Sequence, residues 1–291
     1  MMQMFEGIAL EDWAASSREF LFGNHRLRYW EAGEGEPLLL IHGFPSGAWD
    51  WNYLWPALTQ RYRVIACDML GFGFSDKPRG HAYSLLEQAD IQQALLDHLG
   101  VVQYHLLAHD YGDSVAQEML ARDPQGKFLR SLCFLNGGLF PETHRPVLLQ
   151  RLLMSPIGPL IGRRFSRERM GRTFGRIFGI NTQPTEQELD AFWVMMITNN
   201  GPAVMHRLIR YMAERPVHRD RWVAAMQQTV VPLRVIDGAE DPISGMHMVE
   251  RYRDLIPEAD TVLLRGIGHY PQVEAPELVL EHYLAFRNRV G

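Results

Sequence analysis

The sequence predicts an α/β protein with a mostly parallel, doubly wound sheet and an inserted block of helices. Short apolar runs alternate with longer amphipathic runs from residue 19 to residue 138, which is typical of such a sheet. Polar or glycine-rich residues follow the end of each apolar run, where open parallel sheets place their ligands. The alternation stops and later returns. We therefore expect a core of residues 1–138 and 226–291, and a helical lid of residues 139–225.

The predicted elements follow in order along the chain. Residues 20–33 predict a hairpin with Gly23 and Asn24 at its turn. "EPLLLIHGFP" is a continuously apolar strand of the kind that a parallel sheet buries on both faces. Helical patterns near residues 85–99 and 113–122 separate the next strands, and an amphipathic helix closes the chain. The later strands lie in "RYRVIACDMLGFGFSD", "VVQYHLLAHDYG", "LRSLCFLNGG", "VPLRVIDGAEDP" and "ADTVLLRGIGHYP".

Composition excludes several classes of protein. The 291 residues are 46% hydrophobic and 22% charged, with a net charge of −5. The charge balance is not strongly basic, so it does not indicate a nucleic-acid partner. No apolar run is long enough to span a bilayer. The start of the chain has early acidic residues and lacks the pattern of a secretion signal, which predicts a cytoplasmic protein. Cys67 and Cys133 lie in apolar strands without a CxxC pattern, so we expect buried free thiols.

No cofactor motif is complete in this chain. The glycines of "GFG" at residues 71–73 are not followed by the third glycine of a dinucleotide-binding loop, because Asp76 stands there. His105 and His109 are four residues apart but lie on a predicted strand, where this spacing does not form the helical zinc pair. We therefore expect neither a metal nor an organic cofactor.

Four short segments with chemically active side chains fall at predicted strand ends. They are "HGFP" at residues 42–45, Asp110 in "AHDYG", Asp241 in "DGAEDPIS" and His269 in "GIGHYP". Each has a simpler interpretation by itself: Asp110 as a helix N-cap, Asp241 as a turn residue and His269 as a packed side chain. Their order of nucleophile, acid and histidine, together with a strand–turn–helix around Asp110, favours a catalytic triad.

These motifs resemble those of the α/β-hydrolase superfamily, in its aspartate-nucleophile branch of epoxide hydrolases and haloalkane dehalogenases. "HGFP", "DMLGFGFSDKP", "HDYG" and "GIGHYPQVEAPE" carry the resemblance across almost the whole core. "HDYGDSVAQE" and "FLNGGLFPETHRP" resemble the mesoderm-specific transcript proteins, and this likeness extends into the lid. The resemblance implies an α/β-hydrolase fold and Asp110 as the nucleophile, and it leaves the substrate open.

A carboxylate nucleophile selects a particular electrophile. A free aspartate side chain ionises near pH 4 (about 3.9), so Asp110 needs no base to activate it. Its attack on an sp³ carbon with a leaving group forms a stable alkyl ester, whereas attack on an ester carbonyl would form a mixed anhydride. We expect His269 to activate the water that hydrolyses the ester, and Asp241 to orient His269. The backbone N–H groups of Phe44 and Tyr111 are the expected oxyanion hole.

The leaving group separates the enzymatic alternatives. The resembled dehalogenases bind halide through a Trp after the nucleophile and through an Asn or Trp elsewhere, where this chain has Tyr111 and Phe44. The resembled epoxide hydrolases protonate the opened ring with two lid tyrosines, and the lid here contains Tyr211 alone. We therefore expect an epoxide first, and haloalkane dehalogenation or lactone opening at the alkyl carbon as alternatives. A non-catalytic member that binds a small apolar ligand or a partner protein is the alternative of another class.

Other residues are candidates for substrate contact. We expect His42, His144, Trp193 and Trp222 as pocket-lining residues, with packing as the simpler interpretation of both tryptophans. Residues 163–179 hold six arginines and one glutamate, a pattern that allows a membrane or anionic-ligand surface. A solvated lid helix is the favoured interpretation, because Arg stems cover apolar surface well. The expected partner is therefore a small apolar electrophile, and no pattern indicates an oligomeric state.

Overall fold

A computed structural model describes residues 5–290 of the chain. The predicted cytoplasmic location rests partly on Met1–Met4, which lie outside the described residues. The described chain forms one sheet of eight strands. The strands are β1 (Arg18–Phe22), β2 (His25–Ala32), β3 (Pro37–Ile41), β4 (Arg63–Cys67), β5 (Tyr104–His109), β6 (Leu129–Leu135), β7 (Leu233–Gly238) and β8 (Thr261–Leu264).

The spatial order of the strands is β1-β2-β4-β3-β5-β6-β7-β8. The first two strands form the predicted hairpin, with Phe22 opposite His25 and Gly23 at a φ of 58° in the turn. A positive φ at that position suits glycine, which has no Cβ. The strand β2 also pairs antiparallel with β4, and all later pairs are parallel. The predicted mostly parallel sheet is therefore confirmed.

Both faces of the central strands are buried. Residues 38–41 of β3 have no exposed side-chain surface, and all of β5 is buried. This is why the sequence of these strands is continuously apolar and does not alternate. Cys67 at the end of β4 and Cys133 in β6 are buried free thiols, as predicted.

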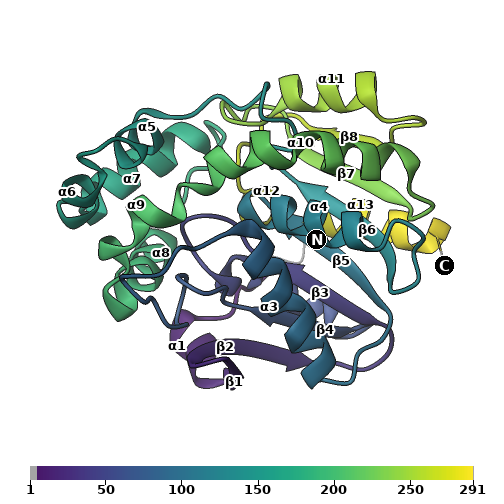
Figure 1. Ribbon diagram of the computed structural model, residues 1–291, viewed down its shortest axis with the longest axis horizontal. Helices are drawn as coiled ribbons and strands as arrows, with labels where there is room; N and C mark the ends of the chain where they lie inside the picture. Colours follow the sequence, from purple (N-terminus) through teal and green to yellow (C-terminus); the bar gives the residue numbers. More distant parts are fainter. Residues whose placement is uncertain (1–4, 291) are drawn as a thin grey trace.

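Helices cover both faces of the sheet. In Figure 1, α3 (Leu85–His98), α4 (Tyr111–Arg122) and α10 (Tyr211–Gln228) lie in front of the sheet, and α13 (Pro276–Val290) lies behind it. The side chain of Ser84 accepts the N–H of Glu87 at 3.1 Å and so caps the start of α3. The other core helices are α1 (Leu10–Ala15), η1 (Ala48–Trp51), α2 (Trp55–Leu58), α11 (Met246–Leu255) and α12 (Pro271–Glu274).

The chain between β6 and β7 is a run of helices that extends to the left of the sheet in Figure 1. These helices are α5 (Leu148–Met154), α6 (Gly158–Arg163), α7 (Arg167–Ile177), α8 (Glu186–Ile197), η2 (Thr198–Ala203), α9 (Met205–Leu208) and the start of α10. Helix α10 continues beyond residue 225, where the predicted lid ends, and it packs against α4. It therefore joins the predicted lid to the core. No helix within residues 5–290 has the length and hydropathy needed to cross a bilayer.

Candidate active site

Asp110 occupies a sharp turn between β5 and α4. Its backbone has a φ of 49° and a ψ of −103°, a conformation that non-glycine residues rarely adopt and that is found at functional sites. The turn brings the start of α4 against the end of β3. A Cβ on Gly112 would lie 2.4 Å from the carbonyl oxygen of Ile41. Only a residue without a side chain fits there, and this close approach holds Asp110 at the edge of the sheet.

Replacing Gly112 by alanine is therefore expected to destabilise the protein. The added methyl group meets backbone atoms that cannot rotate away, so the free energy of unfolding should fall by about 1–3 kcal/mol. Chemical denaturation of the purified variant measures this change. Gly80→Ala is the matched control, because nothing lies within 4 Å of a Cβ at Gly80. Equal stability of the two variants would contradict the close approach.

The Asp110 carboxylate has a donor in the predicted oxyanion hole. The N–H of Phe44 donates to its Oδ2 at 3.0 Å. Tyr111 is the first residue of α4, and the N–H of a first helical residue has no acceptor within its own helix. Asp110 itself is only 3% exposed. The N–H of Phe44 therefore holds Oδ2 of Asp110, and Oδ1 is the carboxylate oxygen that this N–H does not hold.

The ring of His42 binds the backbone next to Phe44. The N–H of Met69 donates to Nε2 of His42 at 3.0 Å, so Nδ1 carries the proton and donates to the carbonyl of Gly43 at 2.8 Å. Burial lowers the pKa of His42 to about 4, which keeps the ring neutral. His42 has no exposed surface. These contacts favour a backbone-supporting role for His42 over the expected pocket-lining one, because both ring nitrogens are bonded to backbone groups.

The predicted acid and histidine are paired. Nδ1 of His269 lies 2.7 Å from Oδ2 of Asp241. The same carboxylate oxygen accepts the amide of Asn136 at 3.0 Å and the hydroxyl of Ser244 at 2.8 Å. Asn136 follows β6, and its position after an apolar run was a signal that the sequence analysis did not use. Asp241 is therefore held by several donors in the orientation that receives the imidazole.

The charges of this pair stabilise each other. Burial acts to raise the pKa of Asp241, but His269 and the hydrogen bonds outweigh it and lower the pKa to about 2. Burial likewise acts to lower the pKa of His269, but the Asp241 carboxylate, with a further contribution from Asp110, raises the pKa to about 9. The carboxylate of Asp241 therefore favours a protonated His269 in the resting protein.

The loop that carries His269 is fixed from two sides. Nε2 of His109 donates to the carbonyl oxygen of His269 at 2.7 Å. The N–H of His269 donates to the carbonyl of Ile177 at the end of α7 at 2.8 Å. No hydrogen bond joins His269 to Asp110, although both are described. A histidine that acts through a water molecule does not need one.

Arg215 is a site residue that the sequence analysis missed. Its side chain is 2% exposed, and its Nε donates to Ser114 at 2.7 Å. Nη2 donates to the backbone oxygen of Asp110 at 3.2 Å and lies 3.9 Å from Oδ1 of its carboxylate. Nη1 lies 3.4 Å from Nδ1 of His144. The sequence signal that could have found Arg215 was its spacing from Tyr211, because residues four apart share a helix face. In the structure the Arg215 guanidinium lies 4.5 Å from the Tyr211 ring centroid.

Tyr211 and His144 also lie at this site. The Tyr211 ring centroid is 4.7 Å from that of Tyr111 and 6.2 Å from that of Phe44. Its hydroxyl is buried with no hydrogen-bond partner among the described residues, and burial raises its pKa. Burial, with the charge of Arg215, lowers the pKa of His144 to about 3, so its Nδ1 can accept from the guanidinium. Two of the predicted lid candidates therefore converge on the Asp110 turn.

The fold agrees with comparisons to known proteins. The model of the alpha/beta hydrolase fold family matches residues 36–276. The chain belongs to this family. The mesoderm-specific transcript protein of Mus musculus is 42% identical, and the match covers 96% of this chain and 88% of that protein. The predicted resemblance to these proteins is confirmed.

Two other matches are more distant. A cis-3-alkyl-4-alkyloxetan-2-one decarboxylase of Shewanella oneidensis is 27% identical, over 92% of this chain and 87% of that protein. The structure of the epoxide hydrolase CorEH superposes with a TM-score of 0.78 at 19% identity, and the match covers 94% of this chain and 99% of that chain. The structural likeness supports the fold of this α/β hydrolase.

The two candidate tryptophans pack elsewhere in the hydrolase. Nε1 of Trp222 donates to Glu118 at 2.8 Å and so joins α10 to α4. Trp193 is half-buried, and its ring centroid lies 6.0 Å from that of Phe165 within the lid. These contacts favour the packing interpretation of both residues over the pocket-lining one. Among the described residues, no group of three or more His, Cys, Asp or Glu side chains is arranged to hold a metal.

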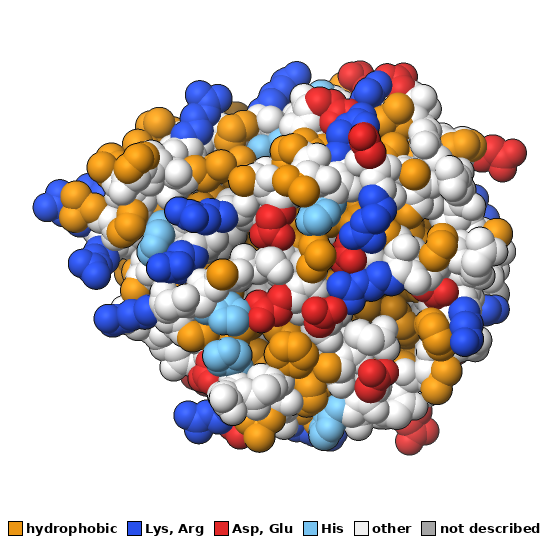
Figure 2. All heavy atoms as spheres, in the orientation of Figure 1, with side chains coloured by type: hydrophobic (Ala, Val, Ile, Leu, Met, Phe, Trp, Pro, Cys, Tyr) orange, Lys and Arg blue, Asp and Glu red, His pale blue; other side chains and the backbone are white. Residues whose placement is uncertain are grey.

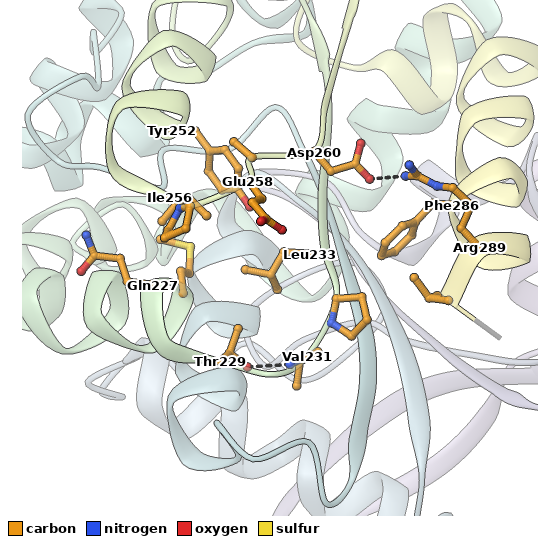
Figure 3. A pocket seen from close by; sticks show the side chains of 15 residues that line it. Gln227, Thr229, Val231, Leu233, Tyr252, Ile256, Glu258, Asp260, Phe286 and Arg289 are labelled. Carbon is orange, nitrogen blue, oxygen red and sulfur yellow. Dashed lines mark hydrogen bonds and ion pairs between the residues drawn. The ribbon is translucent and has the colours of Figure 1, made fainter.

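A cavity of about 530 Å³ lies at the other end of the sheet of this hydrolase (Figure 3). It is lined by Leu233, where β7 begins, and by Asp260, directly before β8. It therefore lies at the amino ends of strands, whereas Asp110 follows the carboxyl end of β5. None of the predicted site residues lines this cavity. The predicted site residues therefore lie away from this cavity.

Proposed function

We propose that this α/β hydrolase opens an sp³ electrophile, first of all an epoxide, through a covalent alkyl ester on Asp110. One observation carries the proposal. The Phe44 N–H holds Oδ2 of Asp110 at 3.0 Å in the predicted oxyanion hole, so Oδ1 is the oxygen that attacks. The Asp241–His269 pair supports a second, hydrolytic step at the same carboxyl group.

In the first step, Oδ1 of Asp110 bonds to one carbon of the epoxide and the ring C–O bond breaks. The ring oxygen takes the proton of Tyr211, whose buried hydroxyl has no partner among the described residues. The products of this step are an alkyl ester with a free hydroxyl group and a Tyr211 phenolate. The guanidinium of Arg215, 4.5 Å from the Tyr211 ring centroid, stabilises that phenolate.

In the second step, His269 takes a proton from water, and the hydroxide attacks the Asp110 carboxyl carbon. The resulting oxyanion is held by the N–H groups of Phe44 and Tyr111. Its collapse breaks the bond to the alkyl oxygen, which takes the proton back from His269 and leaves as the diol. Asp110 loses the new carboxyl proton, and Tyr211 regains one through solvent.

The charge state of the site favours this order of steps. In the resting protein, the Asp110 carboxylate contributes to the raised pKa of His269. Alkylation converts Asp110 to a neutral ester and removes that contribution. The pKa of His269 then falls, and a larger fraction of the imidazole is neutral. Formation of the ester therefore shifts His269 toward the neutral form that can accept a proton from water.

A substrate panel tests the proposed reaction. Epoxides, haloalkanes and lactones are incubated with the protein, and diol, halide and hydroxy acid are measured separately. Epoxide turnover supports the proposal, while halide release alone identifies a dehalogenase. If no electrophile is consumed and Asp110→Ala still binds small apolar ligands, the protein is a non-catalytic member of the fold.

Replacing Tyr211 by phenylalanine is expected to slow alkylation by an epoxide by at least about tenfold, because general acid catalysis typically contributes about 10²–10⁴-fold. Rapid-mixing measurement of ester formation separates this step from hydrolysis. Tyr252→Phe is the matched control, since its hydroxyl is also buried without a partner among the described residues but lies by the remote cavity. Equal alkylation rates in the two variants would show that Tyr211 has only a packing role.

Opening of a lactone at its alkyl carbon is the second candidate, and Arg215 favours it. Attack there by Asp110 releases a carboxylate, which a guanidinium binds through two parallel hydrogen bonds. Arg215 is buried, and its Nη2 lies 3.9 Å from Oδ1 of Asp110, so its charge lies beside the attacking oxygen. The printed name of the Shewanella oneidensis relative describes action on an oxetan-2-one, a cyclic ester. Formation of a hydroxy acid through an alkyl ester on Asp110 decides for this candidate, because attack on the lactone carbonyl gives the same acid without that ester.

A further inference from the structure

The tip of the lid exposes large apolar side chains. We define the lid tip as residues 148–164, which comprise α5, α6 and the residues that connect and follow them. Four of its side chains are exposed although they are apolar: Leu148 (66%), Met154 (42%), Ile157 (52%) and Leu160 (47%). Single exposed apolar residues are ordinary on a protein surface, but a group of four within thirteen consecutive residues indicates a contact surface.

The charges around this group have one sign. No Asp or Glu occurs from residue 143 to residue 167, although the whole chain has a net charge of −5. Figure 2 shows basic and hydrophobic side chains together at the left end of the molecule, where the lid lies in Figure 1. Three exposed arginines lie within the lid tip: Arg151, Arg163 and Arg164. The surface is therefore apolar and cationic at once.

The neighbouring helix α7 differs in the direction of its apolar side chains. Met170, Phe174 and Ile177 are buried against the protein, and the arginines of α7 lie on its outer side. For α7 the solvated-helix interpretation of residues 163–179 therefore stands. In the lid tip Leu153 is buried, but the four apolar side chains given above are exposed. The exposed apolar side chains that binding to a membrane requires therefore lie mainly before residues 163–179, the arginine-rich segment described above.

We propose that the lid tip docks reversibly on the surface of a membrane that contains anionic phospholipids. The four apolar side chains enter the boundary between headgroups and acyl chains, and the arginines pair with lipid phosphates. Charge complementarity selects this partner, because a segment with arginines and no acid attracts a negative surface even on an acidic protein. The proposal does not depend on the reaction that Asp110 performs.

Vesicle sedimentation with the full-length protein tests the proposal. One set of sucrose-loaded vesicles contains phosphatidylcholine alone, and the other contains equal parts of phosphatidylcholine and phosphatidylglycerol. We expect binding to the mixed vesicles that weakens as salt is raised, and little binding to phosphatidylcholine. Leu148→Ser with Leu160→Ser, and separately Arg163→Gln with Arg164→Gln, should each reduce binding by at least about fivefold. All four side chains are exposed, so the variants should fold.

Matched controls lie on the core. Val102→Ser removes an apolar side chain that is 67% exposed, and Arg130→Gln removes an exposed arginine of β6. Both should bind vesicles as the unmodified protein does. Absence of binding to anionic vesicles at low salt overturns the proposal, and so does equal loss in lid-tip and control variants. A dimer in size-exclusion chromatography that the leucine variants dissociate would identify a second copy of the chain as the occupant and also overturn it.

Discussion

Replacing His269 by glutamine is expected to leave the protein alkylated on Asp110 after one equivalent of substrate has reacted. Glutamine retains a polar side chain but cannot accept a proton from water, so ester formation proceeds and ester hydrolysis slows by about 10²–10⁴-fold. One equivalent of epoxide should be consumed, no diol should be released, and the reaction should then stop. Mass spectrometry of the intact protein, followed by peptide mapping, should place the substrate mass on the peptide that contains Asp110.

The control for this variant is His282→Gln, which changes a histidine on α13, away from the site. It should turn over substrate repeatedly and accumulate no adduct. The trapping experiment must also use a substrate that the unmodified protein consumes. If such a substrate leaves no adduct on the His269 variant, the covalent mechanism is wrong, whatever product is formed.

Replacing Asp110 by asparagine is expected to abolish alkylation. The amide has the shape of the carboxylate but is not a nucleophile, so the loss should exceed about 10³-fold for every electrophile that the unmodified protein consumes. Rapid-mixing and mass measurements follow the first step directly. Because asparagine tolerates a positive φ better than most residues, the strained turn at residue 110 should persist.

Asp113→Asn is the matched control, because it changes a second buried aspartate three residues farther along. Burial, with the charge of Asp110, raises the pKa of Asp113 well above its usual range, which favours the neutral carboxyl group. Its replacement by a neutral amide keeps both charge and shape, and activity should change little. A loss as large as that of Asp110→Asn would show that the two carboxyl groups act together and would contradict a single nucleophile.

Local patterns in the sequence predict most of the core. Continuous apolar runs mark the strands that are buried on both faces, and the hairpin turn is marked by Gly23. The order of Asp110, Asp241 and His269 predicts the pairing of acid and histidine. These features are readable because the period of a strand and the demands of a tight turn involve residues that are close together in the chain.

Contacts between distant segments could not be predicted in this way. Trp222 is an aromatic lid residue in the sequence, and only the position of Glu118 shows that it joins two helices. His42 stands beside the oxyanion segment, and only the donor from Met69 shows that its ring is occupied. A side chain that is polar at one end is equally suited to a pocket and to packing. Its partners decide, and they come from other elements.

The sequence by itself determined the mostly parallel sheet, the two free thiols and the residues at the strand ends, because each depends on local periodicity and on turn chemistry. Only the tertiary structure decided that Arg215 lies 3.9 Å from Oδ1 of Asp110, that Asn136 holds Asp241, and that four apolar side chains of the lid tip are exposed. The physical reason is that burial and pairing depend on which surfaces meet after folding. A linear pattern gives the side chains available, and packing determines which of them are covered.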